Sequence, residues 1–451
     1  MRPSQHASYV RFGGLLVTAL AAIVPALALT ACASLNGPAT GGEGATPDSR
    51  WVASWGTAQQ IPDTANELPA ANWRDASLRQ TVRLSLGGSR LRVRLSNVHG
   101  TAPLTVEGAS VALAPAPGKA QIDAATSRAL TFDGSPSVMI PAGAEYYSDP
   151  VALEVNPASD LSVSLYFKEA PPRQTSHSGS RATSFFAKGN RIMDADWAEA
   201  GTIPRWFLVS DVDVQAPRGT GAFVAIGDSI TDGYGVTADS NNRWTDLLAA
   251  RLRQNDQQVG IVNAGIGGGR MLRDGLGPNL ASRFDRDVLS RAGVTHALVF
   301  IGVNDLGGQH RNTPDLPADR KKLLADLRLA HRQLAERAKA RGICMIGATI
   351  TPYVGSDYYH PEPDNEADRQ EMNDWIRKSG VFDAVVDFDA ALRDPADPKR
   401  ISKPLDSGDH LHPSLAGYRA LADAVPLDLL SRNCKNPETD RRDTQETRRA
   451  D

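Results

Sequence analysis

The spacing of apolar residues changes once along this chain, near Gln215–Gly221. Before that point apolar and polar residues alternate, for example from Leu161 to Phe167, and helical patterns are scarce. A period of two is typical of strands with one buried face. We therefore predict an all-β sandwich of the jelly-roll type over residues 51–217.

One part of this region has the pattern of a hairpin. Alternating apolar residues over 82–86 are followed by Gly87-Gly88-Ser89 and by a second alternating run over 91–95. A glycine-rich turn between two such runs predicts that the two strands pair with each other.

Beyond Gly221, short apolar runs alternate with helical patterns. Strands are predicted at 223–226, 260–263, 296–301, 343–350 and 384–388, and a helix at 244–254. A second helix is predicted from apolar residues that share one helical face: Leu323, Leu324, Leu327, Leu334 and Ala338. Strands alternating with helices predict an α/β domain over residues 218–430, with a parallel sheet covered on both faces.

The amino-terminal segment has the pattern of an export signal. Arg2 and Arg11 precede a long apolar run from Phe12 to Ala31, and the run leads into Leu29-Thr30-Ala31-Cys32 at its end. This tetrapeptide resembles the lipobox of bacterial lipoproteins, in which the cysteine is lipidated. We expect residues 1–32 to be a lipoprotein signal peptide with Cys32 as the lipidated residue; the alternative is an uncleaved membrane anchor.

The flanking segments and the location follow from this interpretation. Residues 33–50 are small, polar and rich in Gly and Pro, which predicts a flexible linker, and the charged residues 431–451 predict a disordered tail. The remainder is expected outside the cytoplasm, in the periplasm or at the cell surface, held to a membrane by its lipid.

Charge and cysteine content restrict the partners. A net charge of -3 gives no nucleic-acid surface. The three cysteines, Cys32, Cys344 and Cys434, give neither a disulfide framework nor a zinc spacing. No cofactor is expected, because the glycine run at 265–269 lacks the lysine of a phosphate loop. No metal is expected either, because no cluster of histidines or carboxylates has zinc spacing. The oligomeric state stays open.

Four polar or glycine-rich stretches follow the predicted pattern of a site at the carboxyl ends of parallel strands. Ser229 follows the first strand, residues 265–269 the second and residues 302–305 the third, while Asp409 and His412 precede a final helix. A serine becomes a nucleophile when a histidine takes its proton, and a carboxylate orients that histidine. Glycine N–H groups and an asparagine amide suit an oxyanion.

The blocks "GDSITDG", "NAGIGGGR", "IGVND" and "DHLHP" occur in that order and resemble the four blocks of the SGNH (GDSL) hydrolase family. The resemblance covers about Phe223 to Leu427 and implies a flavodoxin-like α/β/α fold that hydrolyses esters through serine without a metal. The upstream β region resembles the amino-terminal domains of some exported bacterial SGNH hydrolases.

The resemblance also implies roles for the residues at matching positions. Ser229 would be the nucleophile, His412 its base and Asp409 the carboxylate partner of that base. The oxyanion donors would be the backbone N–H groups of Ser229 and Gly268 and the side chain of Asn304.

Neighbouring residues compete for some of these roles. Asp228 and Asp232 are expected to hold the turn through backbone hydrogen bonds rather than to act as the triad acid. His410 competes with His412 as the base, and the two could ligate a metal, but no further ligand cluster has zinc spacing. We expect His410 to shape its loop or to face solvent.

Substrate contacts are expected in Thr351–Asn365, which follows another strand; Tyr353 and Tyr358 are candidate substrate-binding residues there, with Tyr359 and His360. The predicted function is that of a serine esterase removing short acyl or acetyl groups from glycans, so the partner is an ester substrate such as an acetylated carbohydrate. The alternatives are a broad lipolytic carboxylesterase or lipase acting on lipid acyl esters, and, in another class, a non-catalytic surface binding lipoprotein.

Overall fold

The computed structural model describes residues 48–312 and 316–431, which belong to one compact unit. The predicted signal peptide with Cys32, most of the linker and all but the first residue of the charged tail lie outside the described residues. Within the described ranges, no helix combines the length and apolar character needed to cross a bilayer.

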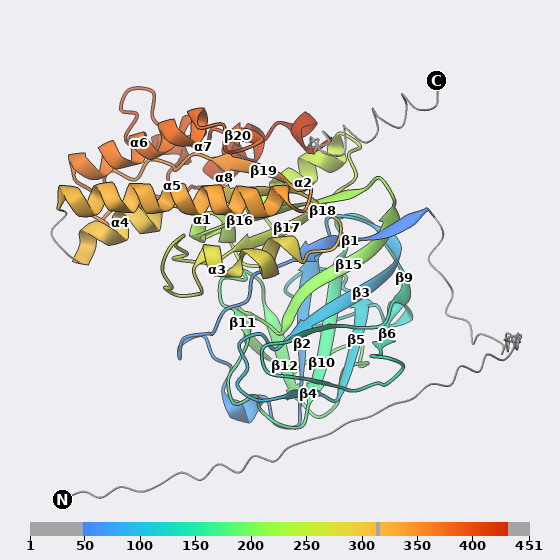
Figure 1. Cartoon of the computed structure of the whole chain (residues 1–451). Helices are drawn as coiled ribbons and strands as arrows, with labels where there is room; N and C mark the ends of the chain where they lie inside the picture. Colours follow the sequence, from blue (N-terminus) through green and yellow to red (C-terminus); the bar gives the residue numbers. More distant parts are fainter. Residues whose placement is uncertain (1–47, 313–315, 432–451) are drawn as a thin grey trace, which may run out of the picture. The chain divides into compact units, whose positions relative to one another are not determined.

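The first region is built from antiparallel sheets, which confirms the all-β prediction (Figure 1). One sheet has the order β1-β15-β3-β8, with β9 also paired to β3, and a second has the order β13-β12-β2-β10-β5-β6. The strands are β1 (Ser49–Gly56), β2 (Ala76–Arg83), β3 (Gly88–Ser96), β4 (Leu104–Val106), β5 (Gly108–Leu113), β6 (Arg128–Leu130), β7 (Val138–Ile140), β8 (Glu145–Tyr147), β9 (Val151–Val155), β10 (Asp160–Phe167), β11 (Ser176–His177), β12 (Ser184–Lys188), β13 (Gly201–Ile203), β14 (Trp206–Phe207) and β15 (Val209–Pro217).

The predicted hairpin through Gly87-Gly88-Ser89 is wrong. Strand β2 pairs with β10 and β12, whereas β3 pairs with β15, β8 and β9 in the other sheet. Between them the N–H of Ser85 donates to the carbonyl of Ser54 at 2.9 Å, so the chain crosses from one sheet to the other. The alternation of apolar residues reports which face of a strand is buried, and it does not identify the strand beside it.

The second region has a five-stranded parallel sheet in the order β17-β16-β18-β19-β20, as predicted. Its strands are β16 (Gly221–Gly227), β17 (Val259–Gly265), β18 (Val294–Phe300), β19 (Cys344–Ala348) and β20 (Ala384–Val386). The helices are α1 (Ser229–Asp232), α2 (Trp244–Gln254), α3 (Leu280–Phe284), α4 (Val303–Asn312), α5 (Pro317–Lys339), α6 (Pro363–Lys378), α7 (Phe388–Leu392) and α8 (Leu415–Ala424).

Alternate residues of β16 face two different cores. Val224 and Ile226 pack in a core with residues of α3, α5 and α6, while Phe223 and Ala225 pack in a core with residues of α2, α7 and α8. Helices therefore cover both faces of the parallel sheet, and the strand ends remain available for a site (Figure 1).

Strand β1 joins the two regions. Thr57, directly after β1, forms a parallel bridge with Asn263 of β17, and the N–H of Ala53 donates to the carbonyl of Ala292 at 2.9 Å. A Cβ at Gly260 would lie 2.1 Å from the Ala53 carbonyl oxygen, so this close approach requires glycine. The β region thereby covers the β17 edge of the parallel sheet.

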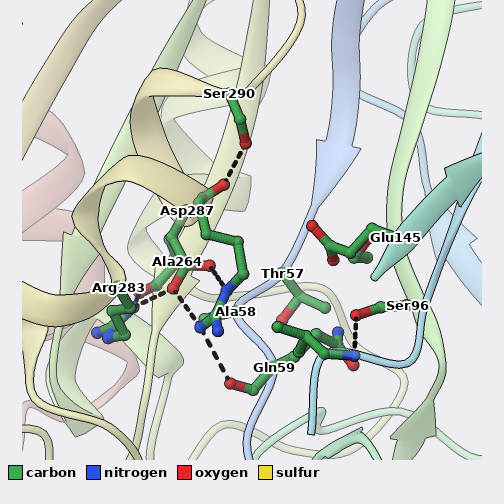
Figure 2. Close-up of polar contacts among 12 residues, drawn as sticks. Thr57, Ala58, Gln59, Ser96, Glu145, Ala264, Arg283, Asp287 and Ser290 are labelled. Atoms are coloured by element: carbon green, nitrogen blue, oxygen red, sulfur yellow. Dashed lines mark hydrogen bonds and ion pairs between the residues drawn. The ribbon is translucent and has the colours of Figure 1, made fainter. Parts of the chain in front are cut away.

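A buried charge cluster lies at the same junction (Figure 2). Asp287, in a π-helical turn after α3, pairs with Arg283 at 2.9 Å and with Arg286 at 2.8 Å. Burial alone would raise the pKa of Asp287, but the facing arginines lower it well below its usual range. Arg291 donates to the carbonyls of Ser210 at 2.6 Å and Thr57 at 2.9 Å, which ties this turn to the β region.

One expectation about cysteines is also wrong. Cys344, at the start of β19, is disulfide-bonded, whereas the spacing in the sequence suggested no such framework. The other two cysteines of the chain, Cys32 and Cys434, lie outside the described residues. Spacing in the sequence does not report distance in space, and three cysteines are too few to form a recognisable disulfide pattern. The sequence therefore did not predict this bond.

Candidate active site

A tight turn follows β16 and places Ser229 at the first position of α1. The Asp228 side chain caps this helix by accepting the N–H of Ile230 at 3.0 Å, and Gly233 ends it with a φ of 93°. A Cβ at Gly227 would lie 2.5 Å from the carbonyl oxygen of Phe300, so the strand end requires glycine. These local features present Ser229 at the carboxyl end of the sheet.

Ser229, His412 and Asp409 form one hydrogen-bonded chain. The Ser229 Oγ lies 2.9 Å from the Nε2 of His412, although the two residues are 183 positions apart. The Nδ1 of His412 lies 2.6 Å from the Oδ2 of Asp409. Ser229 is 7% exposed and His412 is 8% exposed, so the pair is shielded but still reachable. This arrangement can transfer a proton from the hydroxyl to the ring.

The environment of Asp409 keeps its carboxylate charged. Its Oδ1 accepts the backbone N–H groups of His412 and Leu411 and the hydroxyl of Ser407, at 2.8, 3.0 and 2.9 Å. Burial would raise the pKa of Asp409, but the hydrogen bonds from His412 and Leu411 hold it well below its usual range. A fixed anion on Nδ1 selects the tautomer whose Nε2 accepts a proton, and it stabilises the resulting imidazolium.

The ring of His412 is also held by Tyr234. The two ring centroids are 4.1 Å apart, and the planes are tilted by 30°. The Tyr418 hydroxyl donates to the Tyr234 carbonyl at 2.6 Å, and the guanidinium of Arg181, from the β region, lies 5.4 Å from the Tyr234 ring centroid. Sequence reasoning missed Tyr234, although it stands only five residues after Ser229.

Asn304 lies at the start of α4, where both ends of its amide are engaged. Its Nδ2 donates to the carbonyl of Gly269 at 2.8 Å, and its Oδ1 accepts the hydroxyl of Tyr359 at 2.5 Å. Among the described residues, the second N–H of the amide has no acceptor, so it is available to an oxyanion. Gly268 in the facing loop has a φ of +65°, a conformation that favours glycine.

Arg283 supports the two strand ends that carry these loops, and Figure 2 shows it beside Ala264 at one of them. Its guanidinium donates to the carbonyl of Gly227 at 2.9 Å and to that of Ala264 at 2.7 Å. Gly227 precedes the Ser229 turn by one residue, and Ala264 precedes the glycine loop. A buried arginine pairing with Asp287 thus positions both segments, and no local pattern in the sequence identifies it.

Two aspartates near Ser229 hold structure instead of contacting His412. Burial raises the pKa of Asp228 to about 7, and its hydrogen bond to Ile230 opposes that shift. The Oδ1 of Asp232 lies 2.9 Å from the Nε2 of His177, and the Nδ1 of His177, from β11, lies 2.9 Å from the carbonyl oxygen of Ala58. The β region therefore touches the helix that begins with Ser229.

His410 is paired with a different carboxylate. Its Nδ1 lies 2.6 Å from the Oδ2 of Asp406, and its φ of 57° helps to turn the loop. The loop therefore carries two histidine–aspartate pairs, of which only that of His412 contacts Ser229 among the described residues.

The two predicted substrate tyrosines lie in different environments. Tyr353 has no exposed surface, so the structure gives it no route to a substrate, and its hydroxyl has no partner among the described residues. Tyr358 is 56% exposed, and the Cζ of Arg311 lies over its ring, 4.3 Å from the ring centroid. Tyr359, which binds Asn304, is the tyrosine of this segment that contacts the predicted site.

Within residues 48–312 and 316–431, no group of three or more His, Cys, Asp or Glu residues could hold a metal ion.

Comparisons with known proteins find a family that this region resembles. Residues 225–420 match the model of the GDSL-like lipase/acylhydrolase family. No curated protein matches the chain.

Similar solved structures include three from bacteria. A lipase/acylhydrolase from Enterococcus faecalis is 19% identical, with 48% of this chain and 99% of that chain covered and a TM-score of 0.37. The psychrotrophic esterase EstA from Pseudoalteromonas sp. is 19% identical, with 45% of this chain and 93% of that chain covered and a TM-score of 0.33. A GDSL-like lipase from Bacteroides thetaiotaomicron is 18% identical, with 45% of this chain and 84% of that chain covered and a TM-score of 0.34.

The family match coincides with the parallel sheet and with the loops that hold Ser229, Asn304 and His412. Residues 225–420 of this chain are therefore similar to the GDSL-like lipase/acylhydrolase family.

Proposed function

We propose that Ser229, His412 and Asp409 form the catalytic triad of this esterase, acting through an acyl-enzyme. The observation that carries this proposal is the hydrogen-bonded chain from Ser229 Oγ through His412 to Asp409, at 2.9 and 2.6 Å. The nucleophile and base are already within the distance that proton transfer requires.

In the first half-reaction, the Ser229 oxygen attacks the ester carbonyl carbon while His412 takes the hydroxyl proton. The intermediate then collapses: the bond to the alcohol breaks, and His412 gives the proton to the leaving alkoxide. In the second half-reaction, water attacks the acyl-enzyme with His412 again as base, which releases the acid and restores Ser229.

The negative charge that develops on the carbonyl oxygen needs donors that are already in place. We assign this role to the N–H groups of Ser229 and Gly268 and to the second N–H of Asn304. Asn304 supports the assignment because its amide is held from both sides, by Gly269 and by Tyr359. Little reorganisation is then needed during the reaction.

We further propose that the substrate is a short acyl or acetyl ester on a glycan, and that the protein is held outside the cytoplasm by a lipid on Cys32. Exposed Tyr234 and Tyr358 near the site, each with an arginine beside its ring, support a polar substrate. Fatty-acid labelling of the wild-type chain and of Cys32→Ser tests the anchor, because only the wild type should carry the label.

A groove along α3 and α5 favours a second candidate, an ester with a long acyl chain. It encloses about 560 Å³, and its lining includes the apolar side chains of Leu272, Leu323 and Leu334. A series of p-nitrophenyl esters of increasing chain length separates the two candidates. The glycan proposal expects kcat/KM to fall beyond the shortest acyl groups, whereas a lipid esterase would prefer the longer ones.

Turnover of p-nitrophenyl acetate by the full chain tests the triad. We expect hydrolysis in the wild type and its loss in Ser229→Ala, with circular dichroism showing that the variant is folded. Equal turnover in a folded Ser229→Ala would refute the mechanism. Absence of turnover with every ester in the wild type would favour a non-catalytic surface binding lipoprotein.

A further inference from the structure

A small cavity is lined in part by Asn304 and shares Leu272, Arg273 and Leu323 with the larger groove. Its volume is about 120 Å³, enough for a carboxylate or for a few water molecules. The cavity is lined by Arg270, Leu272, Arg273, Asn304, Asp305, Gly308, Gln309 and Leu323. Two guanidinium groups therefore border a space that adjoins a proposed oxyanion donor.

Arg270 is packed into the wall of this cavity. A Cβ at Gly308 of α4 would lie 3.2 Å from the Nη2 of Arg270, so the absence of a side chain there makes room for the guanidinium. The Nε of Arg270 is buried and has no hydrogen-bond partner among the described residues. An unsatisfied buried donor of this kind costs free energy unless something else binds it.

The positive charge at the cavity is not neutralised by ion pairs. Over the described ranges, neither Arg270 nor Arg273 has a carboxylate within 4.0 Å, although the chain as a whole has a net charge of -3. The one acidic residue of the lining is Asp305, whose oxygens accept the N–H groups of Met271 and Leu272 at 2.8 and 3.2 Å. Burial raises the pKa of Asp305 to about 6, while its two backbone hydrogen bonds and the nearby Arg270 and Arg273 lower it. One carboxylate therefore faces two guanidinium groups at this cavity.

Further arginines lie on both sides of the proposed catalytic residues. On the Asn304 side, Arg311 covers the ring of Tyr358, which packs against Tyr359 with a centroid distance of 4.7 Å. On the His412 side, Arg181 lies over Tyr234. Several separate positive charges around one site fit a substrate that carries repeated negative charges better than one with a single headgroup.

We infer that the cavity at Arg270 and Arg273 binds a carboxylate of the substrate, so that the ester cleaved at Ser229 is an acyl group on an acidic glycan. This inference rests on the proposed function and narrows its substrate class. A planar guanidinium matches the two oxygens of a carboxylate. An apolar acyl chain in the same cavity would cover the polar guanidinium groups without bonding to them, which is unfavourable.

Two polymers with the same acetyl esters test the inference: O-acetylated polygalacturonate, and the same polymer after methyl esterification has removed its carboxylate charges. The measurement is acetate release by the full chain. We expect kcat/KM to be about tenfold higher on the charged polymer, as one good charged hydrogen bond provides. The preference should shrink as salt is raised from about 0.05 M to about 0.5 M, because ions screen exposed charges.

Variants identify the residues. Arg270→Gln and Arg273→Gln should each reduce the preference for the charged polymer, Arg270→Gln to near unity and the exposed Arg273→Gln by up to about fivefold. Arg341→Gln is the matched control, because Arg341 is an exposed arginine just before β19, at the amino ends of the parallel strands, whereas the site lies at their carboxyl ends. It should retain the full preference.

The outcomes separate this inference from the proposed function. Equal acetate release from both polymers, no release from either, or an unchanged preference in both arginine variants would overturn the inference. A wild type that hydrolyses anionic phospholipid vesicles faster than the charged polymer would also overturn it. Acetate release that persists in folded Ser229→Ala would instead refute the triad.

Discussion

Replacing Tyr359 by phenylalanine tests how the proposed oxyanion donor is held. The Tyr359 hydroxyl donates to Asn304 Oδ1 at 2.5 Å, while Asn304 Nδ2 donates to Gly269 at 2.8 Å. Without the hydroxyl, Asn304 Oδ1 becomes a buried acceptor with no donor, which costs about 1–3 kcal/mol. The amide can then rotate away from the orientation that serves the transition state.

The expected effect follows from that cost. If the whole cost of about 1–3 kcal/mol is added to the activation free energy, kcat falls by about 5-fold to about 150-fold. Complete loss of one oxyanion donor costs about 10²–10³ in kcat, which sets the upper bound. We expect a loss of about tenfold in kcat with little change in KM, measured on p-nitrophenyl acetate.

Tyr353→Phe is a matched control, since its hydroxyl has no partner among the described residues and its ring is fully buried. This variant should keep kcat and should be as stable as the wild type or slightly more stable. A double-mutant cycle with Asn304→Ala completes the test, because Tyr359→Phe should cost almost nothing when Asn304 is already absent. An unchanged kcat in Tyr359→Phe, or full additivity in the cycle, would refute the reasoning.

Three further predictions concern histidines and aspartates. His412→Ala should lower kcat by about 10⁴-fold or more, because it removes the base that contacts Ser229. His410→Ala loses only the pair with Asp406 and should keep kcat within an order of magnitude. The reverse ranking in an ester assay would contradict the assignment of the base. The pKa of Asp228 is about 7 in the folded protein and 3.8 in the unfolded chain. As pH rises between these values, the unfolded state releases its proton first, so the free energy of unfolding falls, by up to about 4 kcal/mol across the whole window. In Asp228→Asn, which keeps the helix cap, denaturant titrations at several pH values should show this slope reduced, and an identical slope would contradict it. His177→Phe should lower the free energy of unfolding by about 3 kcal/mol because it leaves buried Asp232 unpaired, and His177→Phe with Asp232→Leu should recover part of the loss; no loss in the single variant would show that the pair does not join the two regions.

The fold class was predictable because each region has its own apolar period. Runs such as Phe223–Ile226 are apolar throughout because both faces of the parallel sheet are covered. Strands β16 and β18 lie at the positions of such runs. Strand pairing was less predictable. The run over 82–86 and the run over 91–95 alternate correctly but belong to different sheets, since pairing depends on contacts with β10 and β15, far away in the sequence.

The members of the proposed triad were predictable because motif and strand position agreed, and the structure brings Ser229, His412 and Asp409 into contact. Their supporting residues were not predictable. Arg283 reaches two strand ends from α3, and His177 reaches Asp232 from the β region. Such contacts join side chains from distant elements, so they leave no spacing signal in the sequence.

The same limit applies to the tyrosines of Thr351–Asn365. The segment was expected to lie near the site, and Tyr359 does contact Asn304. Which tyrosine faces the site depends on the path of an irregular loop, and that path buries Tyr353 completely while it leaves Tyr358 exposed. No regular period assigns faces in such a loop.

Covalent trapping of the nucleophile tests whether His412 activates the hydroxyl of Ser229. An organophosphonate that reacts with activated serines is incubated with the full chain, and peptide mass spectrometry locates the adduct. We expect one adduct on Ser229, none in Ser229→Ala, and much slower labelling in His412→Ala, although that variant keeps the Ser229 hydroxyl. Loss of esterase activity with the adduct on another residue, or equally fast labelling of Ser229 in the absence of His412, would contradict this expectation.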